Sequence, residues 1–215
     1  MKQTLNLIWP IRIFDLAVRA THQARIENLK KVSKVKIIFC NNALSSCEGN
    51  PSGNKLKCFA CSYYVKALAR STETETIKMS NYKLNDLEKN SSKDAKYLKE
   101  KSYNAAIGTI ASFEAVSAEE RLSEKGKKEL SLLFRNSMSY YNLLKKIISF
   151  QKNEGYININ LNTFNGRYAT AIQHYFIHKF NPDITCYYYE IWGKMNPYLS
   201  KNKITHDANY IFDSC

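Results

Sequence analysis

The sequence has no long apolar run. No window approaches the roughly 18 to 20 apolar residues of a membrane-spanning helix. The first residues, MKQTLNLIWPIRIF, lack the hydrophobic segment and the small-residue cleavage site of a secretory signal. These absences exclude membrane-spanning and secreted classes, so we expect a cytoplasmic protein, with peripheral attachment to the inner membrane face as an alternative.

Glycine, proline and acidic side chains are also scarce. The chain has 7 glycines, 4 prolines and 19 acidic residues among 215, against 32 lysines and arginines. The resulting charge of +13 favours anionic partners such as nucleic acid, phospholipid headgroups or phosphorylated small molecules. An AT-biased genome produces the same Lys-, Asn-, Ile- and Tyr-rich composition, so charge alone does not identify a partner. The ordinary hydrophobic fraction, 44%, excludes the disordered and fibrous classes.

Strand-like and helix-like segments alternate along the chain. Strands are expected in TLNLIW, KVKIIFC, YININLN and ITCYYYE, and helices over 16–32, 62–71, 127–153 and 166–180. Asp15 is expected to cap the first helix, and Gly155 to end the third. The polar stretch 71–94 and the end of the chain from 191 onward are expected to be loops. This alternation predicts an α/β fold, a Rossmann-like doubly wound, mainly parallel sheet flanked by helices, as a single domain over 1–215.

In open α/β sheets ligands bind beyond the carboxyl ends of the strands. The residues expected there are Arg12, Cys40, Asn41, Asn42, Asn165, Gly166, Arg167, Glu190 and Gly193. Arg167 opens a helix after an Asn-Gly turn, so its guanidinium and the free helix amides favour phosphate or carboxylate. The competing interpretation is a plain turn, with Arg167 paired to Glu190.

Acid–base chemistry has three candidate side chains. Partial burial at the end of an aromatic strand would suit Glu190 to act as a general base, although such a carboxylate also serves as a salt-bridge partner. His206 and Asp207 could form an oriented imidazole. His174 and His178 share a helix face, but without an HExxH pattern they are expected to be a half-buried face rather than metal ligands.

The four cysteines of CNNALSSCEGNPSGNKLKCFAC form a second candidate site. Cys58 and Cys61 have the spacing of half a zinc knuckle, and Cys40 and Cys47 form a looser half. A structural zinc, reduced thiols and a disulfide all remain open. A non-enzymatic basic zinc module that binds nucleic acid is therefore the alternative to an α/β enzyme, although nucleic acid is disfavoured because the intervening loop has only two lysines.

Several motifs together resemble a known family. The series VKIIFCNNALSSCEGNPSGNKLKCFAC, YNAAIGTIAS, FNGRYATA, YYYEIWGK and HD is similar in order to bacterial surface-polysaccharide glycosyltransferases of the capsule and O-antigen type. The resemblance implies the acceptor-side, N-terminal half of a GT-B fold, with the cysteines in a loop after the second strand. Where relatives have arginine after the glutamate, this sequence has Ile191.

The resemblance also implies a reaction and partners. A sugar would pass from a nucleotide-sugar donor to a glycan or lipid-linked acceptor, near an anionic membrane surface. Glu190, His206 and Asp207 would be catalytic, and Arg12, Asn41, Asn165, Gly166, Arg167 and Gly193 would bind substrate. A second, donor-binding GT-B domain is absent, so the chain would be a shortened piece of a longer protein or would be completed by a partner in trans.

Overall fold

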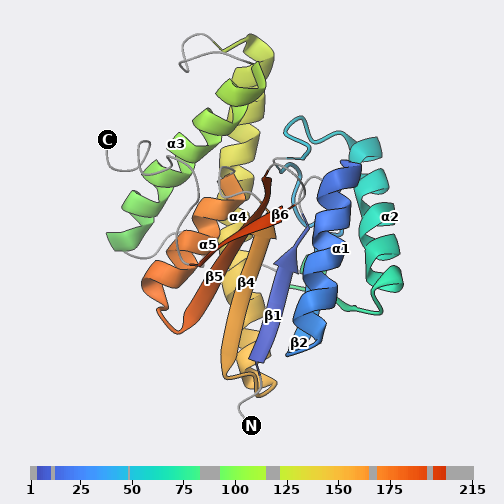
Figure 1. The fold of residues 1–215 in the computed structure, drawn as a ribbon. Coiled ribbons are helices and arrows are strands. Elements are labelled where there is room, and N and C mark those ends of the chain that lie inside the picture. Colours follow the sequence, from blue (N-terminus) through green and yellow to red (C-terminus); the bar gives the residue numbers. More distant parts are fainter. Residues whose placement is uncertain are drawn as a thin grey trace.

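The computed structural model describes residues 4–10, 13–47, 49–82, 93–114, 122–164, 169–192 and 196–201. They form a sheet with helices on both faces (Figure 1). The strands are β1 (Thr4–Trp9), β2 (Lys34–Phe39), β3 (Glu75–Lys78), β4 (Asn158–Phe164), β5 (Ile184–Trp192) and β6 (Asn196–Lys201). The helices are α1 (Leu16–Lys30), α2 (Lys55–Ser71), the 3-10 turn η1 (Met79–Asn81), α3 (Lys93–Glu114), α4 (Glu124–Asn153) and α5 (Ala169–Phe180).

The strand order confirms the predicted doubly wound sheet. The order is β3-β2-β1-β4-β5-β6, and every neighbouring pair is parallel except β5 and β6. The chain moves outward from β1 through β2 to β3 and then returns to the other side of β1 with β4. The strand order therefore reverses between β1 and β4, which is where open α/β sheets place their ligands.

Local signals in the sequence account for the helix ends. The Asp15 carboxylate accepts hydrogen bonds from the first amides of α1, at 3.0 Å from Ala17 and 3.3 Å from Val18. Asn54 caps α2 and Ser123 caps α4 in the same manner. Gly155 follows α4 with a φ of +94°, the left-handed conformation that commonly ends a helix. The predicted cap and stop residues are thus confirmed.

Two hydrophobic cores lie on opposite faces of the sheet. The larger packs β1, β4 and β5 against α3, α4 and α5, and is centred on fully buried side chains such as Leu7, Tyr140 and Tyr188. The smaller packs β1 and β2 against α1 and α2, through Ile8, Ile37 and Val65. Burial on both faces explains the consecutive apolar residues Ile37, Ile38 and Phe39 in the second half of β2.

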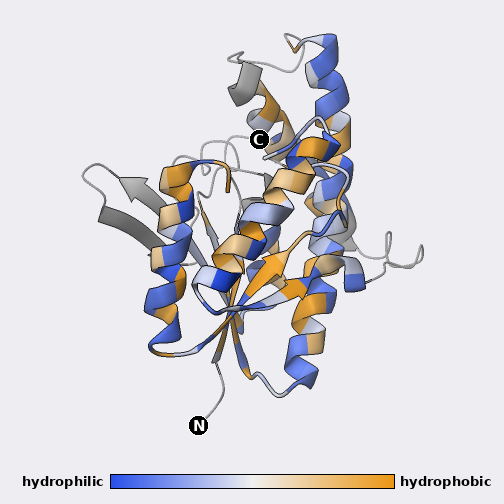
Figure 2. Ribbon diagram, turned by 90° about the vertical axis from the view of Figure 1, so that its right-hand side faces the viewer, coloured by the Kyte–Doolittle hydropathy of each residue, from blue (hydrophilic) through white to orange (hydrophobic). Residues whose placement is uncertain are grey.

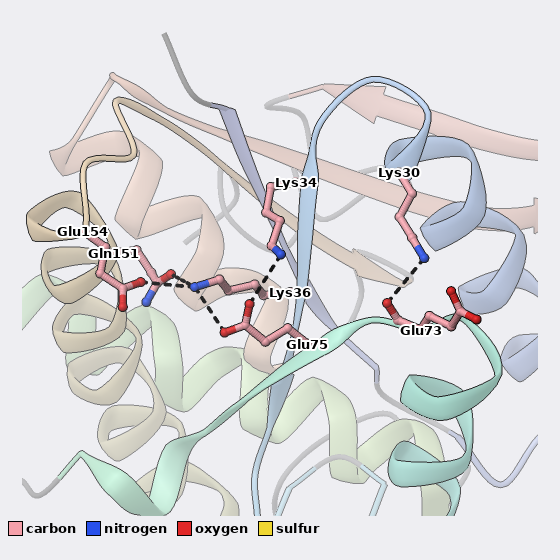
Figure 3. A network of polar contacts seen from close by, with 7 residues as sticks. All are labelled: Lys30, Lys34, Lys36, Glu73, Glu75, Gln151 and Glu154. Atoms are coloured by element: carbon pink, nitrogen blue, oxygen red, sulfur yellow. Dashed lines mark hydrogen bonds and ion pairs between the residues drawn. The ribbon is translucent and has the colours of Figure 1, made fainter. Parts of the chain in front are cut away.

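A polar network holds the amino ends of the strands together (Figure 3). Lys36 on β2 is buried, and its ammonium donates to Gln151 at 2.8 Å and to Glu154 at 3.1 Å, both at the end of α4. Glu75 on β3 lies 3.5 Å from the same ammonium. Burial disfavours the charged lysine, but the hydrogen bond to Glu154 and the charge of Glu75 outweigh it, so the pKa of Lys36 is raised.

Four expectations about the elements were wrong. The polar stretch expected to be a loop contains β3, because Ile77 alternates with exposed neighbours and packs into the core. The segment after 191 contains β6, which pairs antiparallel with β5. Helix α3 was not expected at all. Helix α2 begins at Lys55, seven residues early, because Asn54 caps it.

No helix in the described part of the chain is long and apolar enough to cross a membrane.

Candidate functional site

Most of the substrate-binding and catalytic candidates lie outside the described residues. These are Arg12, Asn165, Gly166, Arg167, Gly193, His206 and Asp207. Glu190 is described only in its backbone, which pairs with Tyr198 of β6. Its expected position at the end of a strand was wrong, because β5 continues through Trp192. Cys40, Asn41, Cys47, Cys58 and Cys61 are described, and they lie together.

The cysteines follow β2 at the carboxyl end of the sheet, but they do not share one loop. Cys40 and Cys47 lie in the segment between β2 and α2, whereas Cys58 and Cys61 lie in the first two turns of α2. The expectation that all four occupy a loop was therefore wrong. Its physical reason is again the Asn54 cap, which starts the helix before the Cys58–Cys61 pair.

The chain leaves β2 through a tight left-handed turn. Asn41 and Asn42 have φ values of +47° and +60°, and the Ala43 amide donates to the Cys40 carbonyl at 3.0 Å. Asparagine tolerates this conformation better than other residues with a side chain. The Asn41 amide group also donates to the Ser80 hydroxyl at 2.8 Å, which ties the turn to the segment after β3.

Two buried asparagines organise the rest of this segment. Asn50 donates to the Asn54 carbonyl at 2.8 Å and to the Cys58 sulfur at 3.1 Å, while its oxygen accepts from the Asn54 amide at 2.9 Å. Asn136 of α4 accepts from the Ser45 amide at 3.0 Å. Gly53 has a φ of +67°, and a Cβ there would lie 2.5 Å from the Ser45 carbonyl oxygen. The segment is therefore fixed to both α2 and α4.

These contacts enclose a cavity of about 50 Å³ between the ends of β1 and β2 and the start of α2. We call it the thiol pocket. A water molecule needs about 10–15 Å³ on this measure, so the space can hold a small ligand group. Its walls are mainly apolar and are formed by Trp9, Pro10, Ile13, Phe14, Ile38, Phe39, Leu44, Val65 and the four cysteines, with Asn41, Asn50 and Lys57 among the polar residues.

Two thiols of this pocket, Cys40 and Cys61, are protonated at neutral pH. Burial raises the pKa of Cys61 to about 12, and the neighbouring Cys40 and Cys58 add to the effect. Burial also raises the pKa of Cys40. None of the five described cysteines forms a disulfide in the structure. At neutral pH Cys40 and Cys61 therefore act as apolar wall groups rather than as nucleophiles.

The described residues hold no group of three or more His, Cys, Asp or Glu side chains arranged to bind a metal. Zinc needs deprotonated thiolates in a tetrahedral set. The structure brings three of the predicted ligands, Cys40, Cys58 and Cys61, close enough to influence one another electrostatically. The zinc site stays a prediction.

A second feature lies beside the pocket, where the strand order reverses. Trp9 of β1 and Thr163 of β4 are paired positions on neighbouring strands, and both side chains are buried. Trp9 packs on Tyr140 with ring centroids 4.8 Å apart, and the Tyr140 hydroxyl lies 2.5 Å from Nε2 of His174. We call Trp9, Tyr140, Thr163 and His174 the switch-point cluster.

The switch-point cluster holds unmet hydrogen-bonding capacity. Trp9 Nε1, Thr163 Oγ1 and His174 Nδ1 are buried and have no hydrogen-bond partner among the described residues. Folded proteins leave few buried polar atoms unpaired, and each one calls for a bound water, a ligand or a strained role. Burial also lowers the pKa of His174 to about 3, so the imidazole is neutral at physiological pH. The cluster can therefore donate and accept hydrogen bonds without adding charge.

The other two histidines in the described part of the chain have structural roles. His178 Nδ1 lies 2.7 Å from the Ile184 carbonyl oxygen, and His22 is buried with its Nδ1 2.6 Å from the Tyr189 hydroxyl. His174 and His178 are therefore part of a packed helix face, as expected.

The switch-point cluster was not predicted from the sequence. Trp9 was expected at the end of a strand, but the candidate ligand-binding residue after that strand was Arg12. Tyr140 was only one apolar position in a long helix, and Thr163 carried no motif. The rule that ligands bind where the strand order reverses could have found the cluster. Applying that rule requires the order of the strands in the sheet, and the positions of the strands in the sequence do not give this order.

Comparison with known proteins supports the fold. No protein-family model matches the chain, and no curated protein matches it significantly. Among solved structures, the chain is similar to a CDPS, a tRNA-dependent cyclodipeptide synthase, from Fluoribacter dumoffii, with a TM-score of 0.50 and 10% identity. The match covers 83% of this chain and 86% of that one. At this identity the likeness shows the Rossmann-like α/β fold.

Proposed function

We propose that this protein binds an amino acid carried on tRNA and takes part in its transfer, with the thiol pocket receiving an apolar amino-acid side chain. The observation that carries the proposal is the chemistry of the pocket. Its walls are mainly apolar, and the side-chain amides of Asn41 and Asn50 already bond to protein atoms. An apolar group fits such walls, whereas a sugar would bring hydroxyl groups that find few free partners.

Two further observations support an RNA-linked substrate. The net charge of +13 suits a polyanionic carrier. The likeness to a tRNA-dependent synthase extends over most of both chains, so that enzyme's fold needs no second Rossmann-like domain. This proposal departs from our sequence-based expectation, which disfavoured nucleic acid as a partner.

The chemistry would be acyl transfer. The ester that joins an amino acid to RNA is activated, and attack by an amine forms an amide while the RNA hydroxyl leaves. Trp9 belongs to both the switch-point cluster and the pocket wall, and its indole N–H, which lacks a partner among the described residues, would donate a hydrogen bond to the carbonyl of the bound group. The protonated thiols of Cys40 and Cys61 would contact its side chain.

The test compares short RNAs that carry an amino acid through a stable 3′-amide with the same RNA lacking it. We expect an apolar amino acid to tighten binding at least tenfold. Cys61→Leu, which fills the pocket, should remove that gain, whereas Cys186→Ala, a buried thiol in β5 away from the pocket, should keep it. Equal affinity for charged and uncharged RNA would refute the proposal.

Glycosyl transfer is the second candidate and depends on the sequence motifs. We would then expect a nucleotide sugar and a glycan or lipid-linked acceptor as substrates, with Glu190 and Arg167 in the roles given above. Titration with a panel of nucleotide sugars and acceptor glycans tests it. An acceptor affinity that Arg167→Ala leaves unchanged would remove the role of that residue.

A structural zinc in the thiol pocket is a separate proposal. Metal analysis of protein purified under reducing conditions tests it directly. About one equivalent of zinc that is lost in a Cys58→Ser variant would support it, and a metal-free protein would end it.

A further inference from the structure

The outer face of α2 has an unusual arrangement of exposed side chains. Leu56, Phe59 and Tyr63 are 79%, 75% and 59% exposed, so no described element covers them. Lys66 and Arg70 are exposed as well. The spacing of these five residues, alternately three and four positions, places them on one side of the helix. We call this set the α2 track.

The chemical nature of the exposed side chains changes along the track. Its first half is apolar and aromatic, and its second half is cationic, over about 21 Å between residues 56 and 70. Helix α2 contains four basic residues and no acidic one. Figure 2 turns this side of the molecule toward the viewer, with α2 between α1 and α4.

The track also begins beside the thiol pocket. Lys57 and Cys58, which line the pocket, are the residues between Leu56 and Phe59. Farther along, the Lys66 ammonium lies 6.0 Å from the ring of Phe39, another pocket residue. A ligand that fills the pocket can therefore continue onto the track.

We propose that the α2 track binds single-stranded RNA, namely the 3′ segment that carries the group held in the pocket. Bases stack on exposed aromatic rings in single-strand binding proteins, and phosphates pair with neighbouring cations. Here Phe59 and Tyr63 provide the rings, and Lys66 and Arg70 provide the cations. The direction of the RNA, with its 3′ end at the pocket, rests on the proposed function. The binding of RNA to the track does not.

The order of apolar and cationic residues along α2 favours RNA over a membrane surface or a second copy of this chain as the ligand of the track. A bilayer is flat, so an in-plane helix needs an apolar stripe along its whole length with cations at its flanks. The track instead places its cations in line with the apolar residues. A second copy of this chain would oppose cations to cations, because a twofold contact uses the same patch on both partners.

The test measures binding of a fluorescein-labelled, uncharged single-stranded RNA ending in CCA by fluorescence anisotropy. We expect the double variant Phe59→Ala/Tyr63→Ala to bind at least tenfold more weakly. Lys66→Ala/Arg70→Ala should lower the slope of log affinity against log salt by about 1.4, as expected for two lost phosphate contacts. Both pairs are exposed, so thermal unfolding should be nearly unchanged.

Matched controls come from other parts of the surface. Val32→Ala/Ile157→Ala removes exposed apolar side chains at the other end of the sheet, and Lys128→Ala/Lys145→Ala removes exposed lysines of α4. Aromatic variants that bind RNA no more weakly than Val32→Ala/Ile157→Ala would overturn the proposal. So would binding to phosphatidylglycerol vesicles without affinity for RNA, or a dimer that the aromatic variants dissolve.

The outcome is separable from that of the proposed function. If the track variants weaken RNA binding but a linked amino acid adds nothing, the track stands and the pocket assignment fails. If a linked amino acid tightens binding and the track variants have no effect, the reverse holds.

Discussion

The two ends of the parallel strands differ in how far their buried polar groups are hydrogen-bonded. At the amino end, Lys36 satisfies its charge with Gln151, Glu154 and Glu75, and Lys30 donates to the Thr72 carbonyl at 2.5 Å. At the carboxyl end, buried donors and acceptors are left over, the backbone turns left-handed at two asparagines, and a cavity remains.

This difference separates stability from function. Satisfied polar networks fix a single arrangement of the chain, whereas unpaired buried groups cost free energy unless something binds them. Loops beyond the carboxyl ends carry the ligands in sheets of this type. The residues at the amino end therefore stabilise the fold, and those at the carboxyl end form the candidate site.

The largest effect is expected at Gly53, in the segment that closes the thiol pocket. Gly53→Ala adds a Cβ in a left-handed conformation and against the Ser45 carbonyl oxygen. We expect a loss of about 3 kcal/mol in the free energy of unfolding, measured by urea denaturation. Gly155→Ala is the control: its φ is also positive but a Cβ meets nothing within 4 Å, so it should cost about 1 kcal/mol. Equal losses would contradict the close approach.

The second prediction concerns the amino end. Lys36→Met keeps the side-chain volume but leaves buried Gln151 without its partner, so we expect a loss of about 2 kcal/mol. Lys34→Met is the matched control, because Lys34 is half exposed and its carboxylate partner Glu75 lies 3.6 Å away. Its loss should stay within about 0.5 kcal/mol. A small loss at Lys36 would mean that the amino end does not hold the fold.

The third prediction is a pH dependence from the carboxyl end. The pKa of His174 is about 3 when folded, against an ordinary value near 6.5, so the unfolded chain takes up a proton that the native state refuses. The contribution of His174 to the free energy of unfolding is fully present above pH 6.5 and is lost as the pH falls toward 3. Between pH 7.5 and 5 the loss should be about 2 kcal/mol larger than in a His174→Gln variant. An equal change with pH in wild type and in His174→Gln would contradict a buried, neutral imidazole at this position.

The smallest effect compares the two ends directly. Thr163→Val removes an unpaired hydroxyl, so we expect stability to be unchanged or to rise by up to about 1 kcal/mol. Thr72→Val removes a buried hydroxyl that donates to the Leu68 carbonyl at 2.7 Å, so a loss of about 1 kcal/mol is expected. Thermal unfolding of both variants measures the difference. Destabilisation by Thr163→Val would mean that its hydroxyl already has a partner.

Much of the fold could be predicted from the sequence because its signals are local. The interior strands show β-branched, apolar or alternating patterns, and Asp15 and Gly155 mark helix ends through their own backbone and side-chain chemistry. The edge strands were missed for a physical reason. β3 buries only one side chain, Ile77, and β6 follows Gly193 and contains Pro197, so neither has a strong period.

The site was less predictable, because it depends on contacts between distant segments. The cysteine segment was located correctly after β2, but its shape depends on Asn136, which lies 91 residues from Ser45. The switch-point cluster joins β1, α4, β4 and α5. No spacing within one segment indicates that Trp9 and Thr163 are neighbours.

Helix α4 reaches from one end of the sheet to the other. Asn136 holds the pocket segment, and Gln151 holds Lys36, on one continuous helix. Each added residue turns a helix by about 100°, so one insertion between these two positions would leave one of them facing the wrong way. The spacing from 136 to 151 is therefore under a length constraint. Relatives of this chain should exchange the exposed residues between these positions more freely than the buried ones, but they should not gain or lose a single residue there.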